Sequence, residues 1–200
     1  GAGKPRVLCP AARIGGGTWS REGVILFVPN WGVGVSQVSA EGGEPKILTH
    51  PDPAKNEPAH RGPIFLPDGR HFLVSTNTGE GDATVLLGSL DTSELRPLLK
   101  GAKARYAPPG YLLFVRDNAI YAQPFDARRL ELQGAPTALF SQPDVGNVDN
   151  SDAGLRYSVS DNGVLSLAPS FNPDYQLTWF DRGGARLGSV GPITRAGQTM

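Results

Sequence analysis

Apolar runs alternate along this chain with short turns that end in glycine, and the combination occurs four times. The turns are Ser20-Arg21-Glu22-Gly23, Leu66-Pro67-Asp68-Gly69, Ala107-Pro108-Pro109-Gly110 and Ser160-Asp161-Asn162-Gly163. The glycines are 46, 41 and 53 residues apart, a period typical of solenoids or propeller blades. Because glycine tolerates positive φ, each unit is predicted to open as a strand, a tight turn and a second strand.

Polar turns divide the rest of each unit into two further short strands. We expect third strands at residues 34–39, 84–90, 119–125 and 176–180. Fourth strands are expected at residues 45–49, 95–99, 130–139 and 186–190, with an irregularity at Gly134. Four short strands in about 40–50 residues are typical of one propeller blade. The blades are therefore predicted at residues 15–50, 60–100, 102–140 and 153–191.

The second strands of units one and three are continuous apolar runs, at residues 24–28 and 111–115. A strand that is apolar on both faces must be covered on both faces, whereas a sheet with one wet face shows alternation. A blade that lies between two neighbouring blades has this cover. The pattern therefore favours an all-β, β-propeller fold, in which the 26 Gly and 18 Pro residues form turns.

We expect the four blades to be a segment of a larger ring. Residues 4–9 resemble the last strand of a preceding blade, and the chain runs on after residue 190. Propellers typically have about 4–8 blades. The chain also begins without methionine, which suggests an excerpt from a longer protein.

Charge and the length of the apolar runs argue against nucleic-acid binding and membrane insertion. With 19 basic and 19 acidic residues, the chain lacks the positive charge expected of a nucleic-acid binder. The longest clean apolar run, residues 24–28, is far shorter than the roughly 20 residues that span a bilayer, so no membrane insertion is predicted. Cys9 is the single cysteine and is interpreted as a buried small hydrophobe.

Residues 65–73, Phe-Leu-Pro-Asp-Gly-Arg-His-Phe-Leu, resemble the Pro-Asp-Gly-Arg signature of WD40-like, TolB-like β-propeller repeats. Residues 19–27, 106–115 and 176–182 are similar to propellers attached to bacterial serine/threonine protein kinases. The resemblance covers about residues 4–190. It implies a parent with an N-terminal kinase domain, usually a membrane helix, and this propeller as a sensory module on the extracytoplasmic, periplasmic side. The turns of units one, three and four depart from Pro-Asp but keep the glycine.

The expected function is a non-catalytic scaffold that binds a protein or a small-molecule ligand. None of the kinase's nucleotide-loop, His-Arg-Asp or Asp-Phe-Gly motifs is present, so no catalytic role is carried over. Two alternatives remain open: an accessory propeller of a prolyl-oligopeptidase-like peptidase, and a stand-alone TolB-like periplasmic scaffold. A channel enzyme is disfavoured because the first strands are mostly apolar or small near Trp19, Phe65, Tyr106 and Val159.

Trp31 is the candidate partner-binding residue, because it lies in the loop between the second and third strands of unit one. The alternative is that Trp31 caps the seam between blades. No catalytic, cofactor-binding or metal-binding residue is predicted. An oxygen-rich loop is interpreted as an inter-blade loop, since its spacing matches no calcium loop fully; it contains Asp144, Asn147, Asp149, Ser151 and Asp152.

Two sets of substitutions follow from the pattern. A β-branched residue resists positive φ, so Gly69→Val or Gly110→Val should destabilise the fold. His50 and His60 flank a proline-rich loop and are expected to be exposed, so replacing either by Ala should change stability by less than about 0.5 kcal/mol. His71 is expected to be a packed or rim histidine.

Overall fold

The computed structural model describes residues 5–12, 15–30, 32–55, 57–76, 83–117, 119–141, 156–168, 174–180 and 186–195. Within these residues the regular structure is antiparallel β-sheet, with one turn of 3-10 helix, η1 (Pro53–Lys55). No described helix is long and apolar enough to cross a membrane.

Two four-stranded sheets follow the order of the chain. Sheet one contains β1 (Gly17–Trp19), β2 (Val24–Phe27), β3 (Ser36–Ser39) and β4 (Lys46–Ile47). Sheet two contains β5 (His60–Phe65), β6 (His71–Thr76), β7 (Thr84–Ser89) and β8 (Thr92–Lys100). Each strand pairs with its neighbour in sequence, so each sheet is an antiparallel meander.

The third sheet keeps this order, but its last strand is divided. It contains β9 (Ala102–Ala107), β10 (Tyr111–Arg116), β11 (Ala119–Asp126), β12 (Glu131–Leu132) and β13 (Thr137–Ser141). Both β12 and β13 pair with β11. The break between them contains Gly134, whose φ of 62° suits glycine. The predicted irregularity at Gly134 is confirmed.

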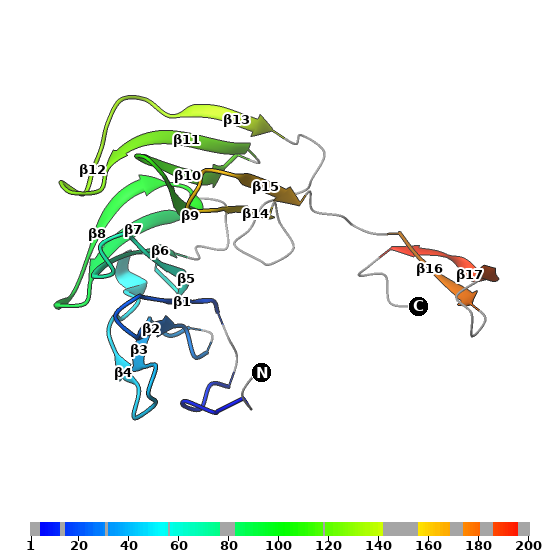
Figure 1. Cartoon of the computed structure of the whole chain (residues 1–200), viewed down its shortest axis with the longest axis horizontal. Helices are drawn as coiled ribbons and strands as arrows, with labels where there is room; N and C mark the ends of the chain where they lie inside the picture. The colour runs from blue at the N-terminus through cyan, green and yellow to red at the C-terminus, as the bar shows by residue number, and fades with distance from the viewer. Residues whose placement is uncertain are drawn as a thin grey trace.

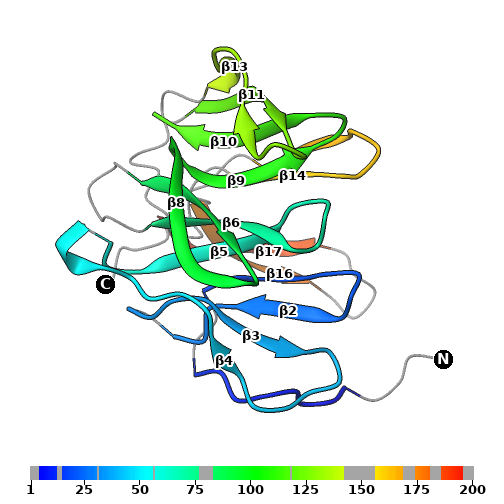
Figure 2. The ribbon, with the colours of Figure 1, turned by 90° about the vertical axis from the view of Figure 1, so that its left-hand side faces the viewer.

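The fourth predicted unit occurs as two separate strand pairs rather than one sheet. β14 (Arg156–Val159) pairs with β15 (Leu165–Ala168), and β16 (Asp174–Phe180) pairs with β17 (Arg186–Arg195). The β14–β15 pair lies beside β9, whereas the β16–β17 pair lies away from the other sheets (Figure 1). Seen from the side, the first three sheets are stacked one on another (Figure 2).

Apolar side chains pack on both faces of the central strands. In β6, Phe72 and Val74 join a core with Leu26 of sheet one. Leu73, between them, faces the other way and joins a second core with Leu112 of sheet three. Successive side chains of a strand point to opposite faces, so one strand contributes to two cores. The predicted cover on both faces is confirmed for the second strand of unit three, where Leu112 and Phe114 join one core and Val115 joins another.

A third, smaller core joins sheet three to the β14–β15 pair. Val115 of β10 and Ile120 of β11 are buried there, and Tyr157 of β14 packs against them. Each of the first three sheets thus shares a core with the sheet or strand pair that follows it in the chain. Since no sheet buries both of its faces alone, the stability of each depends on its neighbours.

Three of the four repeated turns have the predicted glycine geometry. Gly23, Gly69 and Gly163 have φ values of 80°, 66° and 83°. Each donates its N–H to the carbonyl three residues earlier, at 3.2, 3.0 and 3.0 Å respectively. Gly110 lies outside the left-handed region, and its turn instead contains the cis Pro108–Pro109 peptide bond. The prediction of positive φ is therefore wrong for Gly110.

Two predicted strand boundaries are also corrected. Residues 5–9 contain no strand; Arg6 instead donates a hydrogen bond from Nη2 to the Ala40 carbonyl at 2.8 Å, beside the turn after β3. β8 begins at Thr92, three residues before the predicted start, because Thr92 pairs with Ser89 across a two-residue turn. Cross-strand pairing here outweighs the polar composition of residues 91–94.

Candidate functional site

A pocket of about 460 Å³ lies where the four glycine turns converge, and we call it the turn-end pocket. The first strands of the units lie side by side, with β1 next to β5, and β9 next to both β5 and β14. The pocket is lined by residues 18–22 of unit one, 64–67 and Gly69 of unit two, Arg105, Tyr106 and Pro108 of unit three, and Val159 and Asp161 of unit four. Its volume lies within the range of ligand-binding pockets, about 300–1,000 Å³.

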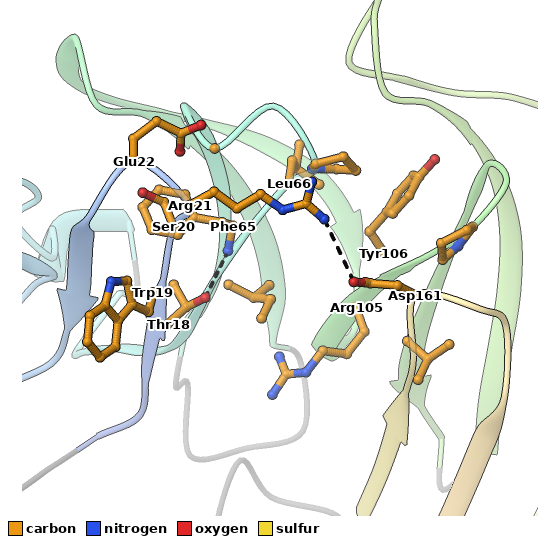
Figure 3. Close-up of a pocket in the computed structure, with 15 residues that line it drawn as sticks. Thr18, Trp19, Ser20, Arg21, Glu22, Phe65, Leu66, Arg105, Tyr106 and Asp161 are labelled. Atoms are coloured by element: carbon orange, nitrogen blue, oxygen red, sulfur yellow. Dashed lines mark hydrogen bonds and ion pairs between the residues drawn. The ribbon is translucent and has the colours of Figure 1, made fainter. Parts of the chain in front are cut away.

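The first strands of units one and two are joined at the pocket wall. The Phe65 N–H donates to Thr18 Oγ1 at 3.4 Å, across the boundary between β5 and β1 (Figure 3). Ile64 and Phe65 are half-buried, whereas Trp19 is 64% exposed. The wall is therefore apolar on the unit-two side, with an accessible aromatic side chain on the unit-one side.

One ion pair crosses from the first turn to the fourth. Arg21 Nη2 lies 4.0 Å from Asp161 Oδ2 (Figure 3), and both side chains are almost fully exposed. Ion pairs of this kind contribute little to stability, about 0–1 kcal/mol, because water screens both charges. Glu22, the other acid of the lining, lies against Gly69. The two acidic side chains of the lining therefore belong to the first and the fourth of the repeated turns.

Arg105 supplies a second positive charge, from β9. Its side chain is half-buried, and Nη1 donates to the Ala104 carbonyl at 3.1 Å. Figure 3 shows its guanidinium well separated from the Arg21–Asp161 pair. Burial raises the pKa of Tyr157 well above its ordinary value, and the nearby Arg105 charge lowers it by a smaller amount. Arg105 therefore borders a poorly solvated part of the molecule.

The partner-binding residue predicted from the sequence is not among the residues that the structure describes. Trp31 lies outside the described residues, and so does the oxygen-rich loop from Asp144 to Asp152. Within the part of the chain that the structure describes, no group of three or more His, Cys, Asp and Glu side chains could hold a metal ion. Cys9 is half-buried rather than buried, which corrects the sequence interpretation.

His60 is buried, so the expectation that it is exposed is wrong. Its side chain is 0% exposed, and Nδ1 lies 2.9 Å from Thr49 Oγ1. Burial, with a smaller contribution from the charge of His50, lowers the pKa of His60 from 6.5 to about 4. His50 itself is exposed, as expected. β5 begins at His60, and the preceding β4–β5 connection supplies both of its polar neighbours: Thr49, and Glu57, whose Oε2 lies 3.8 Å from His60 Nε2.

His71 is half-buried and belongs to a turn-forming cluster. Its Nδ1 is 2.5 Å from Asp68 Oδ2, and the N–H groups of Arg70 and His71 donate to Asp68 Oδ1 at 3.0 and 2.9 Å. Partial burial by itself raises the pKa of Asp68, but these hydrogen bonds outweigh it and lower the pKa below its ordinary value. Asp68 acts as a turn former, as the sequence predicts.

Comparisons with known proteins identify the class of fold. No protein-family model and no curated protein sequence matches the chain. A calcium-binding protein, regucalcin from Agrobacterium tumefaciens strain C58, matches with a TM-score of 0.56 and 12% identity over 86% of this chain and 58% of its own. TolB from Acinetobacter baumannii matches with a TM-score of 0.54 and 18% identity over 92% of this chain and 45% of its own.

A prolyl endopeptidase matches more weakly, with a TM-score of 0.38 and 14% identity over 85% of this chain and 29% of its own. At these identities the matches establish the fold alone. The chain has a β-propeller-type fold, and the predicted all-β, propeller class is confirmed. It spans about half the length of the regucalcin and TolB chains that it matches.

Sequence reasoning missed Arg105, although the repeat contains a signal for it. Arg105 stands five residues before the turn glycine of unit three. The equivalent residues of the other units are Thr18, Ile64 and Ser158. Superimposing the units position by position would have identified Arg105 as the single charge at this point of the four first strands.

Proposed function

We propose that the chain is a non-catalytic β-propeller scaffold that binds a protein or small-molecule ligand at the turn-end pocket. The convergence of turns from all four units on one 460 Å³ pocket supports this proposal. Binding residues are often carried on loops that a rigid scaffold positions. The described lining contains no His or Cys side chain, and the Ser20 hydroxyl accepts a hydrogen bond from the Val24 N–H at 3.2 Å.

A matched pair of exposed side chains tests where ligands bind. Trp19 lines the pocket and is 64% exposed, whereas Ile47 lies on the outer strand β4 and is 65% exposed. Peptides selected on the full chain from a random display library should bind Trp19→Ala at least about tenfold more weakly, because buried tryptophan contacts dominate many interfaces. Ile47→Ala should bind them as the wild type does.

Two results would contradict this proposal. Equal binding by wild type and Trp19→Ala, or a loss confined to Ile47→Ala, would place the ligand site elsewhere. The melting temperatures of both variants are measured in parallel. If Trp19→Ala lowers the melting temperature strongly, competition among the selected peptides and NMR shifts of the wild-type pocket residues decide the location instead.

We further propose that the parent protein is a bacterial serine/threonine protein kinase, with this propeller as its extracytoplasmic sensory or interaction region. The similarity of residues 19–27, 106–115 and 176–182 to kinase-attached propellers supports this context. Sequencing the reading frame in both directions tests it. A kinase domain upstream, followed by an apolar helix, is the expected result, and a hydrolase domain downstream would contradict it.

The structural likeness to TolB favours a second candidate, a stand-alone periplasmic scaffold. The same sequencing distinguishes the two. A signal peptide directly before the propeller, with no kinase domain, would support the TolB-like scaffold and leave the ligand-binding proposal in place.

A further inference from the structure

We propose that Arg105 binds a carboxylate of the ligand in the turn-end pocket, with the apolar part of that ligand against Ile64 and Phe65. This inference rests on the proposed binding function and names the chemistry of the ligand. The carboxylate belongs either to an acidic side chain of a peptide or to a free carboxyl terminus.

The first observation is that Arg105 has no acidic partner among the described residues. None of the described Asp and Glu side chains forms an ion pair with Arg105, and Nη1 donates to the Ala104 carbonyl. A guanidinium has five N–H donors, so one such bond does not use its donor capacity. Since a partly buried charge is costly without a counter-charge, the pocket favours an anion at this place.

The second observation is that the pocket favours a single negative charge over a doubly charged anion. Its lining contains two positive side chains, Arg21 and Arg105, and two negative ones, Glu22 and Asp161. Arg21 already pairs with Asp161, which leaves Arg105 for the ligand. A phosphate dianion would bring a second charge close to the two acids, whereas a carboxylate can accept two parallel N–H bonds from one guanidinium.

The third observation is that apolar side chains of both neighbouring first strands line the pocket with Arg105. Ile64 and Phe65 belong to β5, on one side of β9, and Val159 belongs to β14, on the other side. A ligand pocket usually combines such apolar walls with few polar groups that fix orientation. An apolar side chain adjacent to the carboxylate therefore completes the match.

The repeat shows that the fold itself does not require a charge here. The equivalent positions hold Thr18, Ile64 and Ser158, and all lie on first strands of the same meander type. Arg105 pairs with Leu113 across β9 and β10 as an ordinary strand residue. The charge at this position therefore occurs in unit three alone. This is expected if Arg105 contacts a ligand, because a ligand contact need not be repeated in every unit.

The test uses blocked peptides in acid and amide pairs, on the full chain. N-acetyl-Phe-Glu-amide and N-acetyl-Phe-Gln-amide differ in a side-chain carboxylate, whereas N-acetyl-Gly-Phe and its carboxamide differ in a terminal one. NMR titration measures each dissociation constant and follows the Arg105 Nε–Hε signal. In the wild type, at least one acid should bind about tenfold more tightly than its amide, since charge-assisted bonds are the stronger ones. Which pair shows the difference identifies the source of the carboxylate.

Two variants assign the preference to Arg105. Arg105→Gln should remove the acid-over-amide preference. Arg128→Gln, the matched control at an exposed arginine outside the pocket lining, should keep the preference. Equal binding of acids and amides by the wild type, or a preference that persists in Arg105→Gln, would overturn the inference. An equal loss in Arg128→Gln would also overturn it, because the effect would then be one of general charge.

The two proposals can fail separately. If display peptides require Trp19 but no peptide depends on a carboxylate, the carboxylate inference fails and the scaffold proposal stands. If neither peptides nor probes bind at the turn end, both fail. Should Arg105→Gln not fold, Arg105→Lys replaces it: this variant keeps the charge and loses the bidentate geometry, so the preference should shrink and not vanish.

Discussion

Backbone geometry requires glycine at three of the four repeated turns, and Gly23 offers the clearest test. Its φ is 80°, and an added Cβ would meet only the Ala40 Cβ, at an ordinary contact distance of 3.8 Å. Gly23→Ala should therefore lower the free energy of unfolding by about 1 kcal/mol through backbone strain alone. Urea denaturation of the full chain measures the change.

Gly110→Ala is the matched control, since Gly110 occupies the same turn position without positive φ. Its added Cβ would lie 3.4 Å from the Phe125 carbonyl oxygen, an ordinary contact. Stability should stay near the wild-type value. Equal losses in both variants would contradict the φ argument, and they would return support to a common glycine requirement in all four turns.

The buried His60 predicts that acid destabilises the fold. Its folded pKa is about 4, below the ordinary value of 6.5, so the unfolded state binds the proton more readily between these values. Stability is therefore complete above about pH 6.5 and falls as the pH decreases towards 4. We expect a loss of about 2 kcal/mol between pH 7.5 and pH 5, measured by urea denaturation.

Variants separate His60 from other titrating groups. His60→Gln should flatten the stability between pH 7.5 and 5, whereas His50→Gln, at an exposed site, should retain most of the slope. An unchanged slope in His60→Gln would show that another group is responsible. The sequence could not predict this behaviour, because a histidine beside a proline-rich loop has the same pattern whether or not a strand begins there.

At the scale of elements, Tyr157 joins β14 to sheet three. Its hydroxyl lies 2.5 Å from the Lys103 carbonyl oxygen and 2.8 Å from that of Leu113. These carbonyls flank an irregular part of the β9–β10 pairing, where Lys103 has a φ of 55°. Tyr157→Phe should lower the free energy of unfolding by about 1 kcal/mol, because one buried hydrogen bond is lost.

Tyr106→Phe provides the comparison, since the Tyr106 hydroxyl donates to the Pro109 carbonyl at 3.1 Å in an exposed position. Water can replace that bond, so thermal unfolding should show little change. If Tyr106→Phe lowered the stability as much as Tyr157→Phe, burial would not determine how much these hydrogen bonds contribute to the free energy of unfolding.

Element prediction was accurate where apolar runs decide the structure. The runs at residues 24–28 and 111–115 predicted buried strands, and β2 and β10 occupy them. It was inaccurate where pairing with a neighbour decides. β8 extends through polar residues because β7 pairs with it, and residues 5–9 form no strand despite their likeness to one. Local sequence does not contain the partner strand, so these boundaries could not be predicted.

The candidate site could be predicted only in part, and for a reason that belongs to the whole molecule. The repeated turns predicted that one end of the blades presents four similar loops, and these loops line the pocket. The proximity of Arg105, Ile64 and Val159 depends on how β5, β9 and β14 lie side by side. That arrangement results from packing between sheets, which no single unit encodes.

Because adjacent sheets share cores, a core substitution in one sheet is expected to destabilise the neighbouring sheet as well. Phe72 is fully buried in the core between sheets one and two, and Phe114 is fully buried in the core between sheets two and three. Replacing either by Ala should lower the free energy of unfolding by about 3–5 kcal/mol. In a stack where each sheet contacts its neighbours, the loss is expected to be greatest in the two sheets that share the core.

Amide hydrogen exchange on the full chain distinguishes local from global effects. Phe72→Ala should reduce protection in β2 and β6 more than in β11, whereas Phe114→Ala should reduce it in β10 and β11 more than in β2. Exchange that accelerates uniformly in both variants would contradict nearest-neighbour coupling and would show that the stack unfolds as one unit. Because β6 contributes Phe72 to one core and Leu73 to the other, it should lose protection in both variants under the coupling expected here.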